Sequence, residues 1–241
     1  MMNAAFPLHR LFRGFDQALR RALPGHCAFC LSPVDGTTPW CDPCLLRLPW
    51  IVYACPVCAE PLPTSAAGRH CGACLKWPPT FRHARVALRY EGEIAALMQR
   101  FKYSGSPRAG AILLALLLRQ QATLERMPEA IVGVPLHPRR ARTRGFDQVA
   151  WLARRVSREL GVPLRRARRG RMTDTQVGLG RRERQANVKG AFAIEGTLPA
   201  RVLLLDDIMT TGATLEALAQ ACRNAGAREI DVWAVARTPA S

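Results

Sequence analysis

The sequence has no apolar run long enough to cross a bilayer. The longest, residues 111–118, is far shorter than the roughly 20 residues that a membrane-spanning helix needs. The first 24 residues also lack the continuous apolar core of a secretory signal. Their leucines and phenylalanines recur at helical spacing with arginines between them, which predicts an amphipathic helix over residues 1–24, docked on the protein or lying on a membrane surface. We therefore expect a cytoplasmic protein without a transmembrane segment.

Acidic residues and lysines are both scarce. The 241 residues include 18 acids against 35 basic residues, only three of them lysine, and the net charge is +17. Residues 138–184 alone hold fifteen arginines and four acids. This excess indicates an anionic partner such as pyrophosphate, a nucleotide, nucleic acid or anionic lipid. Aromatic residues make up only 7% and are not interleaved with the arginines, which argues against a base-stacking groove in that region.

The Gly-Lys-Ser/Thr pattern of the P-loop is absent, but another phosphate-binding pattern is present. Four apolar residues, 202–205, predict a buried parallel strand. Asp206 and Asp207 follow it as an acidic turn, and a small, hydroxyl-rich loop then leads into a helix. Backbone N–H groups at a helix start bind phosphate, and the carboxylates could accept from vicinal sugar hydroxyls or help to hold a metal. The alternative is a solvated turn with a threonine cap. The predicted loop residues are Thr210, Thr211, Gly212, Ala213 and Thr214.

Eight of the nine cysteines form four Cys-x-x-Cys pairs within residues 25–79. The gaps of ten and twelve residues between successive pairs are typical of zinc ribbons, whose four thiolates close a tetrahedral structural site. We predict sequential pairing, although the spacing leaves a crossed arrangement open. Disulfides are the alternative, disfavoured because no signal directs export. The predicted Zn²⁺ ligands are Cys27, Cys30, Cys41 and Cys44 at one site, and Cys55, Cys58, Cys71 and Cys74 at the other.

From residue 80 to 241, predicted strands alternate with predicted helices. This order predicts an α/β domain with a mostly parallel, Rossmann-like sheet flanked by helices. The expected strands are 84–90, 130–134, 202–206 and 229–236, and the expected helices are 91–103, 107–124, 144–160 and one that ends near residue 225. The chain is thus predicted to comprise an N-terminal helix (1–24), a double zinc ribbon (25–79) and this domain (80–241).

Further candidate binding residues follow the predicted strand 130–134. Ligands of doubly wound folds bind beyond the carboxyl ends of the strands, so this basic loop could bind a second anionic group. The residues predicted for it are Pro135, Leu136, His137, Arg139 and Arg140. Lys102 is either a site residue or a cation at a helix C-terminus. The polar segment 165–189 has few apolar anchors and could act as a lid, or could be an ordinary surface loop.

Taken together, these motifs resemble the competence protein F (ComF) family, which joins a cysteine-rich zinc module to a type I phosphoribosyltransferase domain. The resemblance covers nearly everything from Cys27 onward and rests on motifs in a shared order. These are the Cys-x-x-Cys pairs, 101–103, 134–138 with 144–148, 175–176 with Arg184 and Asn187, and 202–215.

The resemblance implies a site for phosphoribosyl pyrophosphate or a related nucleotide, with Mg²⁺ between pyrophosphate and ribose. Residues 210–214 would bind the ribose 5-phosphate, Asp206 and Asp207 the ribose hydroxyls, and 134–140 the pyrophosphate. Either aspartate could also stabilise the cationic transition state of phosphoribosyl transfer. The flexible loop would contribute Arg171, Gln176 and Arg184.

The acceptor of such a transfer is not indicated by the sequence. The chain ends shortly after its last predicted strand, so an acceptor-binding hood would have to come from the zinc module or from residues before 130. The resemblance also suggests an alternative function, the handling of single-stranded DNA with DNA-uptake proteins in natural transformation. The arginine-rich region would then contact phosphates, and Trp40, Trp50, Tyr53 or Trp77 would stack on bases.

Overall fold

The computed structural model describes residues 25–35, 38–136, 146–170 and 190–239. Contacts divide the chain into two compact units, residues 1–48 and 49–241. The predicted N-terminal helix lies outside the described residues. Within the described ranges, no helix combines the length and apolarity needed to span a membrane.

The first unit contains a small zinc-ribbon arrangement. Strands β1 (Gly25–His26) and β2 (Pro33–Val34) pair antiparallel, with Gly25 opposite Val34. The short helix α2 (Asp42–Leu46) begins directly after Cys41. Pro43 suits this position because the first turn of a helix does not need its N–H group.

A second ribbon opens the larger unit and includes η1 (Thr64–Ala66) and α3 (Gly72–Lys76). Hydrogen bonds join it to the following sheet. The N–H of Ala84 donates to the carbonyl of Val57 at 2.7 Å, and the N–H of Ile51 donates to the carbonyl of Ala87 at 2.8 Å. The second ribbon therefore continues the hydrogen bonding of the sheet beyond its edge strands.

In the described part of the larger unit, the sheet has six parallel strands. Its order is β3-β10-β9-β5-β6, with β4 also paired to β10. The strands are β3 (His83–Arg85), β4 (Leu88–Arg89), β5 (Ala130–Gly133), β6 (Leu164–Arg165), β9 (Arg201–Met209) and β10 (Glu229–Arg237). The predicted parallel α/β sheet is confirmed. Residues 202–205 of β9 and 232–236 of β10 are all apolar and buried, because helices cover both faces of the sheet.

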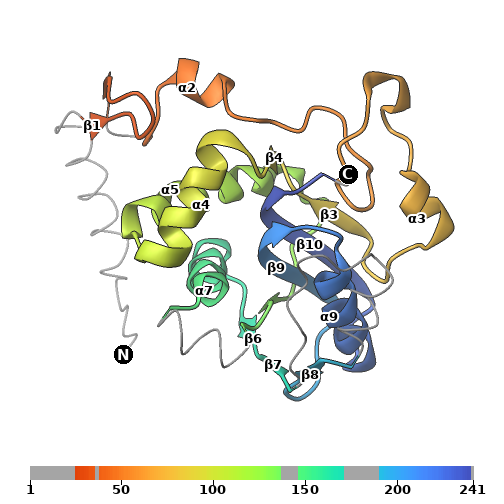
Figure 1. Ribbon diagram of the computed structural model, residues 1–241. Coiled ribbons are helices and arrows are strands. Elements are labelled where there is room, and N and C mark those ends of the chain that lie inside the picture. Colours follow the sequence, from red (N-terminus) through yellow and green to blue (C-terminus); the bar gives the residue numbers. More distant parts are fainter. Residues whose placement is uncertain (1–24, 36–37, 137–145, 171–189, 240–241) are drawn as a thin grey trace, which may run out of the picture. The chain divides into compact units, whose positions relative to one another are not determined.

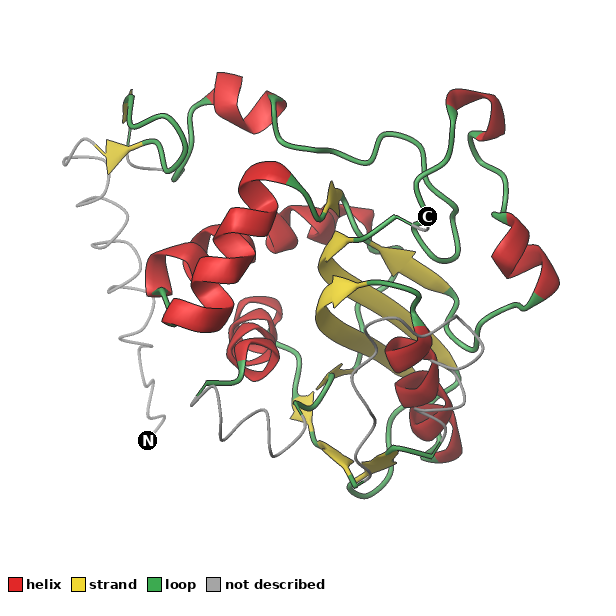
Figure 2. Cartoon of the chain, viewed as in Figure 1, coloured by secondary structure: helices red, strands yellow, loops and turns green. Residues whose placement is uncertain are grey.

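Helices α4 (Gly92–Ser104), α5 (Pro107–Leu118) and α7 (Gln148–Leu160) lie on one face of the sheet, and α9 (Ala213–Asn224) lies on the other (Figure 1). Figure 2 shows the yellow sheet between these red helices. The ring of Phe101 on α4 is fully buried and makes edge contacts with Phe146 and Trp151, each at 5.2 Å between centroids. This aromatic cluster fixes α4 against α7.

Several elements differ from the sequence prediction. The expected strand 84–90 is divided into β3 and β4, and the helix expected over 107–124 changes at Leu118 into the 3-10 helix η2 (Arg119–Thr123). The prediction missed β6 and the antiparallel hairpin of β7 (Ala167–Arg169) with β8 (Phe192–Ile194). Strands of two or three residues carry too little apolar periodicity to be recognised.

Candidate functional site

The two aspartates lie inside strand β9, and the predicted acidic turn after residue 205 is therefore wrong. Asp206 is opposite Ala234 of β10, and pairing continues as far as Met209 opposite Arg237. Because β10 pairs with the backbone of this segment, β9 extends beyond its apolar residues 202–205. Because side chains alternate along a strand, the two carboxyl groups leave opposite faces of the sheet.

Asp207 lies on the face covered by α4 and α7 and is buried. Its Oδ2 atom accepts a hydrogen bond from Nε2 of Gln148 at 2.8 Å and lies 2.9 Å from Nζ of Lys102. Its Oδ1 atom accepts the N–H of Ile208 at 2.6 Å. The side chains of Lys102 and Asp207 are only 15% and 8% exposed. The structure thus brings the predicted Lys102 to the aspartate pair, as a buried counter-ion.

Asp206 has a different environment. Its Oδ1 atom accepts the N–H of Asp207 at 2.8 Å. Burial, and then the charge of Asp207, raise the pKa of Asp206 to about 8, although Lys102 and Arg169 oppose the shift. Two carboxylates on adjacent residues resist ionising together, so one of them holds its proton more tightly.

The loop after β9 has the expected path into a helix. Gly212 is the N-cap of α9 with φ of 79°, a left-handed conformation that glycine adopts readily. A β-carbon at this position would lie 2.9 Å from Cε of Met209. The Oγ1 atom of Thr211 accepts the N–H of Ala213 at 3.4 Å. Because Gly212 has no side chain to cap the helix, the N–H groups of the first turn beyond Ala213 can donate to an anion.

The loop after β5 begins beside the aspartates. The N–H of Val134 donates to the carbonyl of Leu205 at 2.9 Å, so Pro135 and Leu136 leave the sheet next to Asp206. The remaining predicted binding residues of this loop and of the expected lid lie outside the described residues. They are His137, Arg139, Arg140, Arg171, Gln176 and Arg184.

The cysteines gather into two clusters, and both clusters have the predicted sequential pairing. In each cluster the four Sγ atoms lie within 4.8 Å of one another. One comprises Cys27, Cys30, Cys41 and Cys44, and the other Cys55, Cys58, Cys71 and Cys74. Burial raises the pKa of Cys58 to about 12, although the charge of Arg237 opposes the shift. Thiols packed this closely ionise together only with a cation between them, and four sulfur ligands suit zinc.

A buried ion pair connects the second cysteine cluster to the sheet. Arg237, the last residue of β10, donates from Nε to Oε2 of Glu60 at 3.0 Å and also from Nη2. The two side chains are only 5% and 14% exposed. Glu60 follows Cys58 closely, and its carbonyl accepts the N–H of Cys55 at 2.8 Å. The ion pair therefore lies between a metal-binding turn and the end of a central strand.

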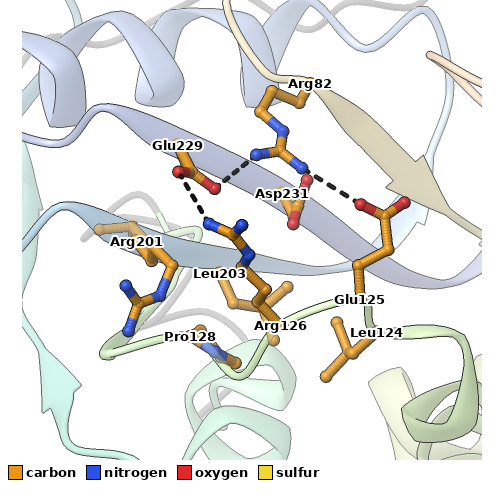
Figure 3. Close-up of a pocket in the computed structure, with 10 residues that line it drawn as sticks. Arg82, Leu124, Glu125, Arg126, Pro128, Arg201, Leu203, Glu229 and Asp231 are labelled. Carbon is orange, nitrogen blue, oxygen red and sulfur yellow. Dashed lines mark hydrogen bonds and ion pairs between the residues drawn. The ribbon is translucent and has the colours of Figure 1, made fainter.

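A second polar cluster lies at the opposite, amino-terminal end of β9 and β10 (Figure 3). Arg82 pairs there with Glu229 and, at 3.6 Å, with Glu125. Arg126 lies 4.0 Å from Glu229. The lining includes three arginines and three acids, so their charges balance. This cluster therefore has no excess of positive charge that would attract an anionic ligand.

Sequence reasoning missed three residues that matter at these sites. Gln148 belongs to a motif of the family resemblance, but no sequence pattern marks Gln148, Glu60 or Arg237 as a site residue. Gln148 donates a hydrogen bond to Asp207, 59 residues away in the sequence, and Arg237 donates to Glu60, 177 residues away. No local sequence pattern reveals pairs that are so far apart. A weak signal existed for Arg237, because a charged residue directly follows the apolar stretch of β10.

Two parts of the chain match models of known protein families. A family model described as a double zinc ribbon domain matches residues 18–75, and one described as a phosphoribosyl transferase domain matches residues 150–241. Among solved structures, the purine phosphoribosyltransferase of Pyrococcus horikoshii is 22% identical, with a TM-score of 0.35 over 55% of this chain and 85% of its own.

Two curated relatives are similar over nearly their whole length. Competence protein F of Haemophilus influenzae is 35% identical over 230 residues, which is 91% of this chain and 93% of the relative. The DNA utilization protein YhgH of Escherichia coli is 32% identical over 225 residues, which is 90% of this chain and 98% of the relative. The chain therefore belongs to the competence protein F family, with a double zinc ribbon ahead of a phosphoribosyltransferase domain.

Proposed function

We propose that this protein binds phosphoribosyl pyrophosphate, together with Mg²⁺, at the carboxyl end of β9. The observation that carries the proposal is the position of Asp206, partly buried, one short loop before the glycine-capped start of α9. A carboxylate beside an open helix N-terminus suits a sugar phosphate, because one accepts from hydroxyls and the other donates to phosphate. The phosphoribosyl transferase family model covers this same segment.

The proposed arrangement assigns a part of the ligand to each described loop. The 5-phosphate would lie at the first turn of α9, within reach of Thr211 and Thr214. The ribose hydroxyls would lie against the aspartate pair. The pyrophosphate would extend toward Pro135 and Leu136, beyond which the arginine-rich residues of that loop follow. Magnesium would be held mainly by pyrophosphate oxygens, and it would neutralise the charge of that leaving group.

Calorimetric titration with phosphoribosyl pyrophosphate in magnesium tests this proposal. Thr211→Glu places a negative charge at the phosphate position and should weaken binding at least tenfold, since like charges in a partly buried site repel by more than about 1.4 kcal/mol. Asn224→Glu adds the same charge at the far, exposed end of α9 and should bind like the wild type. A wild-type protein that shows neither binding nor thermal stabilisation by millimolar ligand would refute the proposal.

Measuring the release of pyrophosphate tests whether the protein also breaks the bond between pyrophosphate and ribose. Catalysis requires groups that stabilise charge in the transition state, and Asp206 and Asp207 are the candidates for the ribose cation. Metal-dependent release of pyrophosphate that is abolished by Asp206→Asn would establish cleavage of the bond to the anomeric carbon, with water taking the ribosyl group when no other acceptor is supplied. Binding without release would indicate that the site only holds its ligand.

A second candidate function is the handling of single-stranded DNA in the cytoplasm. Tyr53 and Trp77 of the second ribbon are 40% and 45% exposed, and Nζ of Lys76 lies 4.7 Å from the ring centroid of Trp77. An exposed indole beside a cation suits a nucleic-acid base and its phosphate. Trp40, by contrast, is buried. The relatives named for competence and for DNA utilization support this proposal.

Titration of a fluorescent oligothymidine tests the DNA-handling function. Trp77→Ala should weaken binding about fivefold to a hundredfold, the range expected when one base loses an aromatic stacking partner. Leu75→Ala, at another exposed apolar position of α3, is the matched control and should bind like the wild type. Equal affinities of the two variants would show that DNA does not stack on this tryptophan.

A further inference from the structure

Two segments of the second ribbon lead to the two ends of the loop that is proposed to bind phosphate. This ligand loop comprises residues 210–212, between Met209 at the end of β9 and Ala213 at the start of α9. Each segment of the ribbon begins with a Cys-x-x-Cys pair of the second cysteine cluster. Residues 55–60 lead to the β9 end of the loop, and residues 71–80 lead to the α9 end.

The first segment reaches the β9 end of the loop through Arg237. The carboxylate of Glu60 accepts hydrogen bonds from the buried guanidinium of Arg237. Arg237 is opposite Met209 in the sheet, and the N–H of Thr238 donates to the carbonyl of Met209 at 3.0 Å. A β-carbon on Gly212 would lie 2.9 Å from Cε of Met209, so the methionine side chain lies directly against the ligand loop. The ribbon therefore supports the residue against which the loop packs.

The second segment reaches the α9 end of the loop through Thr80. The N–H and Oγ1 of Thr80 both donate to the carboxylate of Glu216, at 2.7 and 2.6 Å. Nη2 of Arg223, farther along α9, donates to the carbonyl of Thr80 at 3.1 Å. Glu216 lies in the first turn of α9, and its own N–H donates to the carbonyl of Gly212 at 2.8 Å. Glu216 therefore connects Thr80 directly to the ligand loop.

The connections between the cysteines and these contacts are short. Glu60 ends the first segment, and its carbonyl accepts the N–H of Cys55 at 2.8 Å. In the second segment, α3 and two consecutive prolines, whose rings fix φ, lead to Thr80. The two segments meet at their sulfur atoms, because Sγ of Cys58 and Sγ of Cys71 are 3.5 Å apart. A metal ion held by the four thiolates would therefore fix Glu60 and Thr80 relative to each other.

We propose that the second ribbon is a metal-dependent support of the ligand loop, so that zinc at the second cysteine cluster and phosphate at α9 each strengthen the binding of the other. This inference rests on the proposed function, since it concerns the regulation of the same site. Thr80 and Arg237 are the positioning residues that transmit the effect. Coupling between two sites is reciprocal and typically changes each affinity by about 5- to 150-fold.

The ligand loop benefits from such support because it adds little rigidity of its own. The hydrogen bond from the N–H of Ala213 to Oγ1 of Thr211 is long, at 3.4 Å. Backbone N–H groups bind an anion best when they are already oriented toward it, since a loop that must be ordered on binding loses affinity. Contacts that hold Met209 on one side and Glu216 on the other orient these donors before the ligand arrives.

Competition with a chelator tests the coupling on the full-length protein with both zinc sites filled. Alkylation of the released thiols, read by mass spectrometry, reports zinc loss from each cysteine cluster separately. Saturating phosphoribosyl pyrophosphate, in excess magnesium, should raise the zinc affinity of the second cluster about 5- to 150-fold relative to the first. The first cluster is the internal reference, because a ligand that merely bound free zinc would affect both clusters alike.

A matched pair of threonine variants tests the route through Thr80. Thr80→Val keeps the size of the side chain but removes one donor to Glu216, and should reduce the protection of the second cluster about threefold or more. Thr64→Val, at an exposed position of η1 in the same ribbon, should retain the protection. Equal protection in the two variants would show that Thr80 does not transmit the effect.

The proposed function and the coupling fail in different ways. If phosphoribosyl pyrophosphate with magnesium does not bind in calorimetry, the proposed function is refuted and the coupling with it. If it binds but protects both clusters equally, or protects neither, the proposed function stands and the coupling is wrong. Binding with protection confined to the second cluster supports both.

Amide hydrogen exchange tests the support without any ligand. Thr80→Val should speed the exchange of the Glu216 amide about threefold or more, because the first turn of α9 then loses part of its contact with the ribbon. Thr64→Val should leave this exchange unchanged. The same exchange rate in both variants would overturn the proposed support, whether or not the protein binds a sugar phosphate.

Discussion

Replacement of Arg237 by methionine should destabilise the second ribbon and the sheet together. The guanidinium lies at the end of β10, almost fully buried, and donates twice to Glu60. Methionine fills similar space but removes the guanidinium charge that faces the buried Glu60 carboxylate. Removing one partner of a buried pair costs about 3 to 5 kcal/mol. For a unit of this size that corresponds to a fall in melting temperature of between about 6 and about 20 °C.

The same substitution should weaken one zinc site and spare the other. Arg237 acts on the thiol of Cys58, and groups just outside a metal's ligands typically change its affinity by about 10- to 100-fold. A chelator titration that follows both metals should show one zinc released more readily and one unchanged. The cluster of Cys27, Cys30, Cys41 and Cys44 lies in the other compact unit and serves as the internal reference.

Two further variants determine whether burial is the cause. Arg168→Met breaks an exposed pair, with side chains of Arg168 and Glu195 that are 77% and 39% exposed, and should cost less than about 1 kcal/mol. Glu60→Gln added to Arg237→Met should recover part of the stability, because the buried carboxylate charge is then removed as well. The reasoning is refuted if Arg237→Met costs no more than Arg168→Met, or if both zinc ions become labile to the same degree.

Three other predictions follow from local contacts. Asp206→Asn should raise the melting temperature of the ligand-free protein at pH 8 and above. The raised pKa of Asp206, about 8, means that native stability is lost as the pH rises from about 4 to about 8, by on the order of a few kcal/mol. Gly110→Ala should lower the free energy of unfolding by about 1 to 3 kcal/mol, because the new β-carbon would lie 2.5 Å from a buried phenylalanine ring. Gly72→Ala, also in a helix, is the control, because its β-carbon would meet no atom within 4 Å. Asp147→Ala should cost about 1 kcal/mol by removing the cap of α7, whereas Glu91→Ala removes no capping bond from α4.

Thermal denaturation across a pH series measures all three. A difference between Asp206→Asn and the wild type that stays constant from pH 4 to pH 9 would contradict the raised pKa. Equal stabilities of the two glycine variants would show that the phenylalanine ring moves aside without cost. An effect of Glu91→Ala as large as that of Asp147→Ala would mean that capping does not explain the stability of α7.

Much of the architecture could be predicted from local patterns, and the deviations have physical causes. Spacing alone was enough for the two cysteine clusters, because a Cys-x-x-Cys turn aligns its own thiols. Apolar runs identified the long strands β9 and β10, whose faces are covered by helices. The end of β9 was placed too early, since pairing with β10 keeps Asp206 and Asp207 in the strand.

The candidate site was harder to predict than the fold. The glycine-capped loop before α9 was recognisable, because its conformation follows from neighbouring residues. The contacts of Asp207 were not, because Lys102 and Gln148 reach it from two helices that are distant in the chain. Tertiary contacts of this kind depend on how the helices pack, and local patterns in a single sequence do not reveal that packing.

The hydrogen bonds between the second ribbon and the sheet have a consequence for how the protein can be divided. A fragment cut at the sequence boundary near residue 80 would strip β3 of its partner at Val57 and leave Arg237 without Glu60. A fragment that begins at residue 49 keeps both. We expect the fragment that begins near residue 80 to aggregate through its uncovered edge strand. The fragment that begins at residue 49 should be the smallest that keeps the loop before α9 in a stable fold, and it contains one metal site instead of two.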